Sequence, residues 1–367
     1  MISLLLALAV VQAEPSEYYV PETACYASTP LEWAHEDGGQ QIGLAGEILR
    51  PAGAGPRPTV LMITGSGDHV RQQMISGSAM FSMIADALVR AGFNAVLADP
   101  RGFGESTVDG EALDGPQWLQ IPSSIRYRDN RHIIDDLLAR DAVSDLIVLG
   151  HSEGAMITAR LAADDDRIAA VVLLGDSTLP GSDVFARQRA DFMVREGVDP
   201  AIAARTRPAL RAFADFVASD ARADDTEFAR VSEAMMTAQS GLDEPFYDAD
   251  LLDFYRNGSA WYREYFGYDP SADLSRLTTP VLAVWGGHDD ATPPARHVPA
   301  LTAALSRAGN SDHEIHILPN QDHFFLEFEG ERVDRHPYGR VRIAPELTRV
   351  LVDSLTRRFG ETGYCSD

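Results

Sequence analysis

The sequence predicts an α/β fold with a mostly parallel central sheet, helices on both faces and one helical insertion. Short continuous apolar runs alternate with helical patterns, which is typical of parallel strands buried on both faces. The expected strands are the two arms of a hairpin around residues 37–39 and the runs 59–63, 93–98, 146–149, 168–174, 280–285 and 314–318. No strand-like run occurs from residue 181 to 270. We therefore expect a helical insertion there, after the sixth strand.

The N-terminal residues predict export. Residues 2–13 are almost entirely apolar and end in Ala13, directly before Glu14 and Pro15. Such a run is too short to span a bilayer and is typical of a secretory signal peptide. We expect residues 1–13 to be removed and the mature protein to be periplasmic or secreted. The run lacks a positively charged start, which leaves a buried first strand or a wrongly assigned start codon as the alternatives. No later segment is apolar enough for us to expect a membrane span.

The charge and cysteine content exclude several kinds of chemistry. The chain has 55 acidic and 31 basic residues, a net charge of −24, and every basic residue is arginine. Without lysine there is no Ser-Lys dyad, Schiff base or P-loop. The acidity argues against nucleic acid or an anionic membrane as a partner. The two cysteines, Cys25 and Cys365, have no metal-binding or redox spacing, so we expect no metal or cofactor and predict a disulfide between them.

The first part of the core, residues 14–180, contains a loop suited to binding an anion. The strand at 59–63 ends in Thr64-Gly65-Ser66-Gly67, and a helix is expected at 81–91. Glycines after a core strand let backbone N–H groups face an incoming anion. We therefore predict that the Ser66 N–H is one half of an oxyanion hole. A plain turn into the helix is the alternative.

A second loop of the core carries an acid, an arginine and two glycines. The strand at 93–98 runs directly into Asp99-Pro100-Arg101-Gly102-Phe103-Gly104. We expect Asp99 and Arg101 to stabilise this loop by hydrogen bonds to the backbone. A catalytic role for Asp99 is the alternative. An amphipathic helix is expected to follow at 129–140.

The most informative segment is Gly150-His151-Ser152-Glu153-Gly154, between an apolar strand and a helix. A strand that turns straight into a helix leaves no room for β-carbons on either side of the turn, and the residue at the apex is held in a strained conformation. Its side chain is exposed at the positive end of the helix, which suits a nucleophile. We predict that Ser152 is that nucleophile and that the Glu153 N–H is the second oxyanion donor. An ordinary turn with a capping serine is the alternative.

The insertion, residues 181–270, is expected to be a helical lid. Helical patterns cover residues 184–194, 200–219 and 226–239, and an aromatic cluster follows at 246–268. The aromatic residues either line a substrate pocket or pack the lid against the core. We expect the three methionines of this region to be packing residues: Met193, Met235 and Met236.

The second part of the core, residues 271–367, supplies an acid and a base. Asp289 follows the strand at 280–285, and His323 follows the strand at 314–318. Because the carboxyl ends of parallel strands meet at one edge of a sheet, we expect both side chains to lie near Ser152. Helices are expected at 296–305 and 344–358. Three other histidines lie on elements where a structural role is usual: His297, His313 and His316.

The order Ser152, Asp289, His323 resembles the α/β-hydrolase superfamily. Its motifs are Gly-x-Ser-x-Gly at 150–154, Asp-x-Arg-Gly-x-Gly at 99–104 and Gly-x-x-Asp-x-x-Thr-Pro at 286–293. The resemblance extends over residues 42–358 and is strongest to bacterial lidded serine hydrolases of the acyl-esterase or prolyl-oligopeptidase-like kind. It implies cleavage of small carboxylic esters through an acyl-enzyme, with no metal or organic cofactor. Asp68 and His69 depart from the pattern, in the loop of the predicted oxyanion donor Ser66.

Two other functions stay open from the sequence. A serine peptidase or amidase would use the same three residues, and the insertion carries acids that could bind a substrate amine: Asp243, Glu244, Asp248, Asp250 and Asp253. A non-catalytic binding protein on the same fold would usually have lost the serine or the histidine, and this chain keeps both. The oligomeric state is not predicted.

Overall fold

The structure is a computed structural model that describes residues 25–53, 55–75, 78–326 and 345–360. The predicted signal peptide and Cys365 lie outside these residues. No helix within the described ranges is long and apolar enough to cross a membrane.

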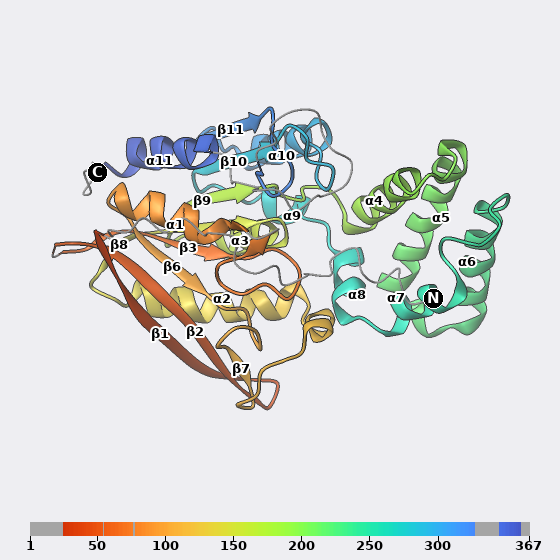
Figure 1. Cartoon of the computed structure of the whole chain (residues 1–367), viewed down its shortest axis with the longest axis horizontal. Helices are drawn as coiled ribbons and strands as arrows, with labels where there is room; N and C mark the ends of the chain where they lie inside the picture. The colour runs from red at the N-terminus through yellow and green to blue at the C-terminus, as the bar shows by residue number, and fades with distance from the viewer. Residues whose placement is uncertain (1–24, 54, 76–77, 327–344, 361–367) are drawn as a thin grey trace.

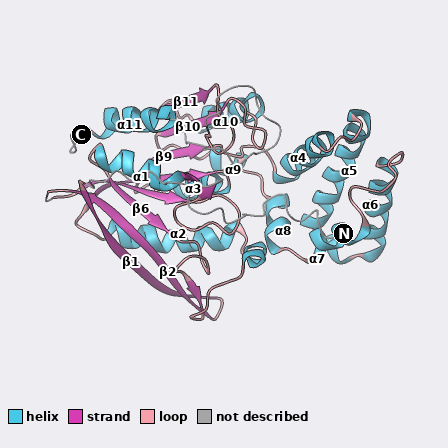
Figure 2. Cartoon of the chain, in the orientation of Figure 1, coloured by secondary structure: helices cyan, strands magenta, loops and turns pink. Residues whose placement is uncertain are grey.

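One mixed sheet forms the centre of the molecule (Figure 2). Its strands lie in the order β1 (Tyr26–Asp37), β2 (Gln40–Pro51), β6 (Asn94–Ala98), β3 (Arg57–Ile63), β8 (Val143–His151), β9 (Ile168–Leu174), β10 (Val281–Gly286) and β11 (His313–Leu318). The pairs β1–β2 and β2–β6 are antiparallel, and the sheet is parallel from β6 to β11. The predicted hairpin and the mostly parallel sheet are therefore confirmed. Short β7 (Thr107–Val108) pairs with β2, and β4 (Met74–Ile75) pairs with β5 (Ser78–Ala79).

Helices cover both faces of this sheet, as the continuous apolar strands predict. Along β8, Leu146 and Val148 belong to one buried cluster, while Ile147 and Leu149 belong to the other. The first cluster includes side chains from α2 (Ser123–Leu138), α3 (Glu153–Asp164), α9 (Ser271–Leu274) and α10 (Pro294–Ala308). The second includes side chains from α1 (Met80–Arg90) and α11 (Pro345–Phe359). Alternate residues of each strand thus face opposite helical layers.

The chain between β9 and β10 is helical and has an apolar interior of its own. It forms α4 (Gly181–Arg195), α5 (Pro200–Ala218), η2 (Asp220–Ala223), α6 (Asp225–Ala238), α7 (Ala249–Asn257) and α8 (Ala260–Gly267). Figure 1 shows α4 to α7 to one side of the sheet, with α8 nearest to it. Met193 and Met235 are fully buried in this region, whereas Met236 is 42% exposed, so the packing role predicted for Met236 is wrong.

One boundary in the core differs from its prediction in a way that matters for the site. Helix α2 begins at Ser123, not at residue 129, and its extra turns carry the buried side chain of Arg126. The serines and arginine of these turns resemble a loop in sequence. They are helical because their polar groups have partners on other elements, including carboxylates of Glu153 and Glu264. The 3₁₀ helix η1 (Gly115–Gln120) precedes α2.

Candidate active site

Ser152 lies at the apex of a strained turn between β8 and α3. Its backbone has φ 55° and ψ −117°, a conformation that L-residues rarely adopt. A β-carbon on Gly150 would lie 2.1 Å from the carbonyl oxygen of Gly154, and one on Gly154 would lie 2.1 Å from that of Ile63. Only glycine fits on either side of Ser152, as the motif predicts. The serine is half-buried, at the N-terminus of α3.

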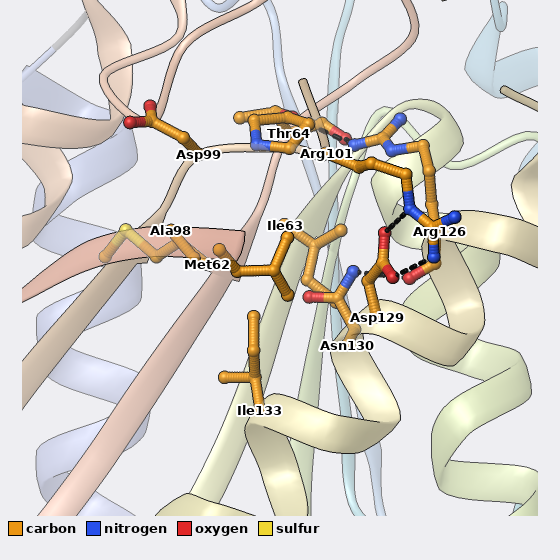
Figure 3. A pocket seen from close by; sticks show the side chains of 12 residues that line it. Met62, Ile63, Thr64, Ala98, Asp99, Arg101, Arg126, Asp129, Asn130 and Ile133 are labelled. Atoms are coloured by element: carbon orange, nitrogen blue, oxygen red, sulfur yellow. Dashed lines mark hydrogen bonds and ion pairs between the residues drawn. The ribbon is translucent and has the colours of Figure 1, made fainter. Parts of the chain in front are cut away.

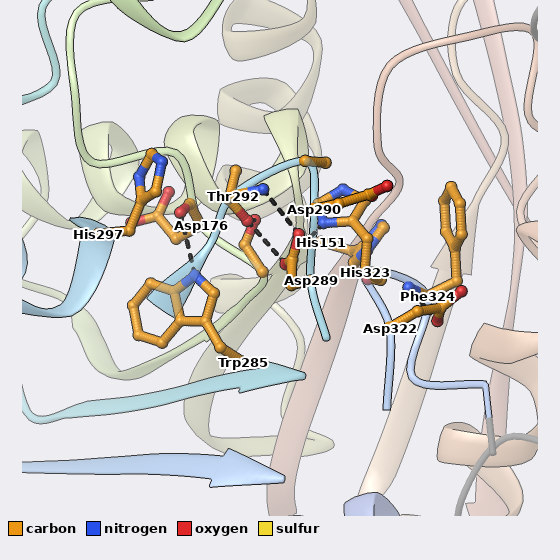
Figure 4. A network of polar contacts seen from close by, with 12 residues as sticks. His151, Asp176, Trp285, Asp289, Asp290, Thr292, His297, Asp322, His323 and Phe324 are labelled. Carbon is orange, nitrogen blue, oxygen red and sulfur yellow. Dashed lines mark hydrogen bonds and ion pairs between the residues drawn. The ribbon is translucent and has the colours of Figure 1, made fainter. Parts of the chain in front are cut away.

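Asp289 and His323 are joined by a hydrogen bond across the ends of two strands. His323 Nδ1 lies 2.9 Å from Asp289 Oδ2, and Thr292 donates to the same carboxylate through its backbone N–H (2.6 Å) and its hydroxyl (2.8 Å) (Figure 4). Asp289 can only accept when ionised, so Nδ1 carries the proton, and in the neutral ring the Nε2 lone pair is available. The neighbouring Asp290 instead pairs with Arg195 at the surface.

The electrostatics of this pair favour an ionised acid beside a basic histidine. Burial alone would raise the pKa of Asp289. The charge and hydrogen bond of His323, together with two hydrogen bonds from Thr292, hold this pKa below its ordinary value. Burial alone would lower the pKa of His323, but the Asp289 charge and hydrogen bond raise it above 6.5. A histidine in this state is a suitable general base near neutral pH.

Contacts with β9 place Ser152 and His323 at the same edge of the sheet. The Ser152 N–H donates to the carbonyl oxygen of Leu174 (2.8 Å). The next residue is Gly175, on which a β-carbon would lie 3.1 Å from the His323 ring and 3.5 Å from the Asp289 carboxylate. In the part of the chain that the structure describes, no hydrogen bond joins the Ser152 hydroxyl to His323. Catalytic hydrogen bonds are often long before substrate binds.

His151 and Gln73 hold the surrounding loops together, and sequence reasoning missed both roles. His151 Nε2 lies 2.9 Å from the backbone oxygen of His323, which can only accept, so Nε2 carries the proton. Its Nδ1 accepts from the Gln73 side-chain amide (2.8 Å), whose oxygen accepts from the Gly65 N–H (2.8 Å). Burial, followed by the nearby His323, lowers the pKa of His151 to about 3, so this ring stays neutral. No local pattern marks Gln73 as a bridge.

The predicted oxyanion loop lies directly beside Ser152. A β-carbon on Gly65 would lie 3.5 Å from that of Ser152. Among the described residues, neither the Ser66 N–H nor the Glu153 N–H donates a hydrogen bond to the protein. His69, which follows in the loop, is half-buried, and burial together with the Arg126 charge lowers its pKa to about 4.

Arg126 was not singled out from the sequence, yet it lies at the centre of the polar contacts behind this loop. Figure 3 shows its guanidinium close to Thr64 and above the Arg101–Asp129 pair. It donates to the backbone of Thr64 and Gly65 and pairs with the Glu153 carboxylate at 3.0 Å. A predicted helix that began before residue 129 could have revealed Arg126, because this residue lies two turns before Ile133 on such a helix.

The loop predicted to be structural has that role. The Asp99 carboxylate accepts from the backbone N–H groups of Arg71 (2.7 Å) and Glu105 (3.0 Å). Arg101 pairs with Asp129 and Asp37 rather than with backbone. His297 is also structural: it is fully buried in α10, and its Nδ1 accepts from the Thr178 N–H (3.0 Å).

Two kinds of curated relatives resemble the sequence. The chain is 26% identical over 315 residues to Esterase EstD of Thermotoga maritima, which covers 84% of this chain and 66% of that protein. It is 26% identical over 311 residues to a 2-hydroxy-6-oxononadienedioate/2-hydroxy-6-oxononatrienedioate hydrolase of Klebsiella pneumoniae, covering 83% of this chain and 92% of that one.

Solved structures show the same fold at lower identity. An esterase from Pyrococcus furiosus has a TM-score of 0.52 and 12% identity, covering 93% of this chain and 96% of that one. The α/β hydrolase GrgF from a Penicillium species has a TM-score of 0.52 and 15% identity, covering 91% and 99%. The model of the family described as the alpha/beta hydrolase fold matches residues 58–329. This match spans most of the chain and agrees with the sheet order and the turn at Ser152, so the protein belongs to the α/β-hydrolase fold family.

Proposed function

We propose that the protein is a serine hydrolase that cleaves carboxylic esters through an acyl-enzyme, with Ser152, His323 and Asp289 as its catalytic residues. The observation that carries this proposal is a serine in a strained strand-to-helix turn, at the sheet edge where a buried histidine is hydrogen-bonded to a buried aspartate. The surroundings of the pair fit these roles, because they lower the pKa of Asp289 and raise the pKa of His323.

In the proposed mechanism His323 Nε2 takes the proton of the Ser152 hydroxyl as the oxygen attacks the ester carbonyl. Asp289 holds the imidazole in the required tautomer and stabilises the imidazolium. His323 then gives the proton to the leaving alcohol. Water repeats the sequence on the acyl-enzyme, releasing the acid and restoring Ser152.

The oxyanion of the tetrahedral intermediate binds to the backbone N–H groups of Ser66 and Glu153. Both groups lack a partner among the described residues and flank Ser152, one on the loop after β3 and the other at the first turn of α3. A donor in such a site contributes about 3 kcal/mol to transition-state stabilisation.

Esters are preferred to amides for two reasons. One of the curated relatives is an esterase. The acids that would bind a substrate amine, Asp243, Glu244, Asp248, Asp250 and Asp253, are all exposed on the insertion. The relative from Klebsiella acts, by its name, on a 2-hydroxy-6-oxo dicarboxylate, so such compounds belong in the substrate panel.

The insertion is proposed to be a lid that sets the substrate range. Its helix α8 carries Trp261, whose indole N–H donates to the Glu153 carboxylate beside Ser152 (2.9 Å). The location is also part of the proposal: the apolar residues 2–13 favour a periplasmic or secreted protein.

A fluorophosphonate probe followed by a substrate panel tests the proposal. The probe should label Ser152, and Ser152→Ala should abolish both labelling and hydrolysis. A series of p-nitrophenyl esters of increasing acyl length should be cleaved, and matched p-nitroanilides should be cleaved far more slowly. Labelling at another residue would refute the mechanism, and faster cleavage of the anilides would favour the amidase.

A further inference from the structure

The Arg126 guanidinium holds the two segments that carry the proposed oxyanion donors. Nη2 donates to the Thr64 carbonyl (2.6 Å), and Nη1 donates to the Gly65 carbonyl (3.0 Å) and to Glu153 Oε2 (3.0 Å). In a trans peptide the C=O of one residue and the N–H of the next point in opposite directions. Because Arg126 draws the Gly65 C=O to itself, the Ser66 N–H must point away from Arg126.

The Glu153 carboxylate connects Arg126 to the insertion. Its Oε2 accepts from Arg126, while its Oε1 accepts from the Ser123 hydroxyl (2.5 Å) and from the Trp261 indole N–H (2.9 Å). Glu153 is 3% exposed and Arg126 is 7% exposed. A buried ion pair of this kind is held in place by the donors that complete it, and the loss of one donor leaves charge poorly compensated.

Helix α8 lies against the same part of the core through three further contacts. The Glu264 carboxylate accepts from the backbone N–H of Ser124 (2.7 Å) and from its hydroxyl. The Ser259 hydroxyl donates to the Leu119 carbonyl (3.1 Å), and the Gln120 amide donates to the Gly258 carbonyl (2.7 Å). Thus α8 rests on the chain that leads into α2, the helix that carries Arg126. Figure 1 shows α8 between α2 and α7.

We propose that Trp261 is a positioning residue for the oxyanion site: with α8 docked on the core, its indole N–H fixes the Glu153 carboxylate, and through Arg126 the direction of the Ser66 N–H. This inference rests on the proposed function and deepens it, because it names how the insertion controls the chemistry. Trp261 acts through Glu153, so its loss should weaken binding of the transition state more than binding of the substrate.

The substitution Trp261→Phe tests this role, because it removes the N–H donor and keeps an aromatic ring. Trp118→Phe is the matched control: its ring lies 5.1 Å from that of Trp261, edge to face, and it makes no hydrogen bond to Glu153. The measurements are kcat and KM for p-nitrophenyl acetate, and the inhibition constant of phenylboronic acid, which forms a tetrahedral adduct on the serine.

For Trp261→Phe we expect kcat to fall about ten-fold because the donors are slightly misplaced, with KM within about two-fold of the parent value. Boronate inhibition should weaken by about the same factor as kcat. Trp118→Phe should leave all three quantities unchanged. Arg126→Lys should lower kcat further, because one ammonium cannot hold two carbonyls and a carboxylate in the planar arrangement of a guanidinium.

Two results would overturn the inference. Equal losses in Trp261→Phe and Trp118→Phe would show that the ring pair acts only by packing. An altered KM for Trp261→Phe with unchanged kcat and boronate affinity would show that the residue only contacts substrate. Failure of the proposed function is a separate outcome, because Ser152→Ala would then retain the esterase activity on which these comparisons depend.

Discussion

The α/β core and the helical insertion place their carboxylates differently. In the core, charged side chains near the strand ends are buried and paired, as for Asp289 with His323 and Arg126 with Glu153. The interior of the insertion is an apolar cluster of residues from α4 to α8, and its carboxylates at 243–253 are exposed. The core therefore holds reactive groups in fixed positions, whereas the insertion presents a charged outer surface over its own small core.

Polar contacts join the two regions at two places. One is the docking of α8 on Glu153 and on the start of α2. The other is α4, where Arg187 donates to the carbonyl oxygens of Asp290 and Ala291, close to Asp289 in the chain. Because the apolar clusters of the two regions are separate, we expect changes in the core to abolish the chemistry. Changes in the insertion should alter stability and substrate range, except at Trp261, which contacts Glu153 and should affect kcat.

The largest expected effect is a difference in kcat between substitutions at two neighbouring acids of the core, Asp289 and Asp290. Asp289→Asn should lower kcat about 10⁴-fold, because an asparagine favours the wrong histidine tautomer and does not stabilise imidazolium. Asp290→Asn is the control, since its carboxylate is 42% exposed and pairs with Arg195. Steady-state kinetics on one p-nitrophenyl ester compares them. If Asp290→Asn proves to be the damaging change, Asp289 is not the catalytic acid.

A matched pair of phenylalanines tests whether the regions are independent. Phe213 and Phe93 are both fully buried. Phe213 lies in the apolar cluster of the insertion, and Phe93 lies in the core cluster that includes α1 and α11. Each Phe→Ala change should destabilise its own region by about 3–5 kcal/mol. Limited proteolysis of Phe213→Ala should cut the insertion while a small fluorophosphonate still labels Ser152. Phe93→Ala should lose labelling and protease resistance together. If both variants lose labelling and protease resistance together, the two regions do not unfold independently.

The pH dependence of hydrolysis reports on the core alone. The reaction needs His323 without its second proton, so kcat/KM should rise with pH through the pKa of the free enzyme's histidine. Burial alone would lower the pKa of His323, but the charge and hydrogen bond of Asp289 outweigh burial and raise this pKa. The midpoint of the profile should therefore lie above 6.5. In Asp289→Asn the raising interactions are lost, and the midpoint should move to lower pH. A pH-stat assay measures both profiles, and an unchanged midpoint in the variant would argue that another group titrates.

The sequence predicted the parts of the molecule that depend on local patterns. Apolar runs gave the parallel sheet and its two helical layers, and the glycines around Ser152 predicted a strained turn. Asp289 and His323 were located because each follows a core strand. These signals work because strand ends converge at one edge of a parallel sheet, whatever the rest of the chain does.

The contacts behind the site could not be predicted, because they join residues far apart in the chain. Nothing near Arg126 indicates that it would bind the loop at Thr64 or the carboxylate of Glu153. Trp261 was one aromatic residue among many, and only the docking of α8 distinguishes it from those that fill the insertion. The role of Gln73 could not be predicted either, because its side chain bonds to Gly65 and His151, which only the fold brings next to it.

The smallest expected effect concerns the two ends of the chain. Tyr26, the residue after Cys25, and Phe359, at the end of α11, both pack against the apolar cluster on the same face of the sheet. Tyr26 and the end of α11 therefore lie on one layer, which favours the predicted disulfide; Cys365 itself lies outside the described residues. A bridge requires α-carbons within about 7 Å.

The bridge would close most of the chain, and loop entropy would assign it about 6 kcal/mol. We expect a much smaller gain in melting temperature, because Cys25 precedes β1 and Cys365 follows α11 in the chain, outside the elements of the core. Its main effect should be to protect the two ends from proteases, which Cys25→Ser would remove while leaving esterase activity unchanged. Non-reducing mass spectrometry of protein recovered from an oxidising compartment tests the bridge directly. Two free thiols there would refute the disulfide and weaken the proposal of export, because an exported protein with this pairing has no reason to stay reduced.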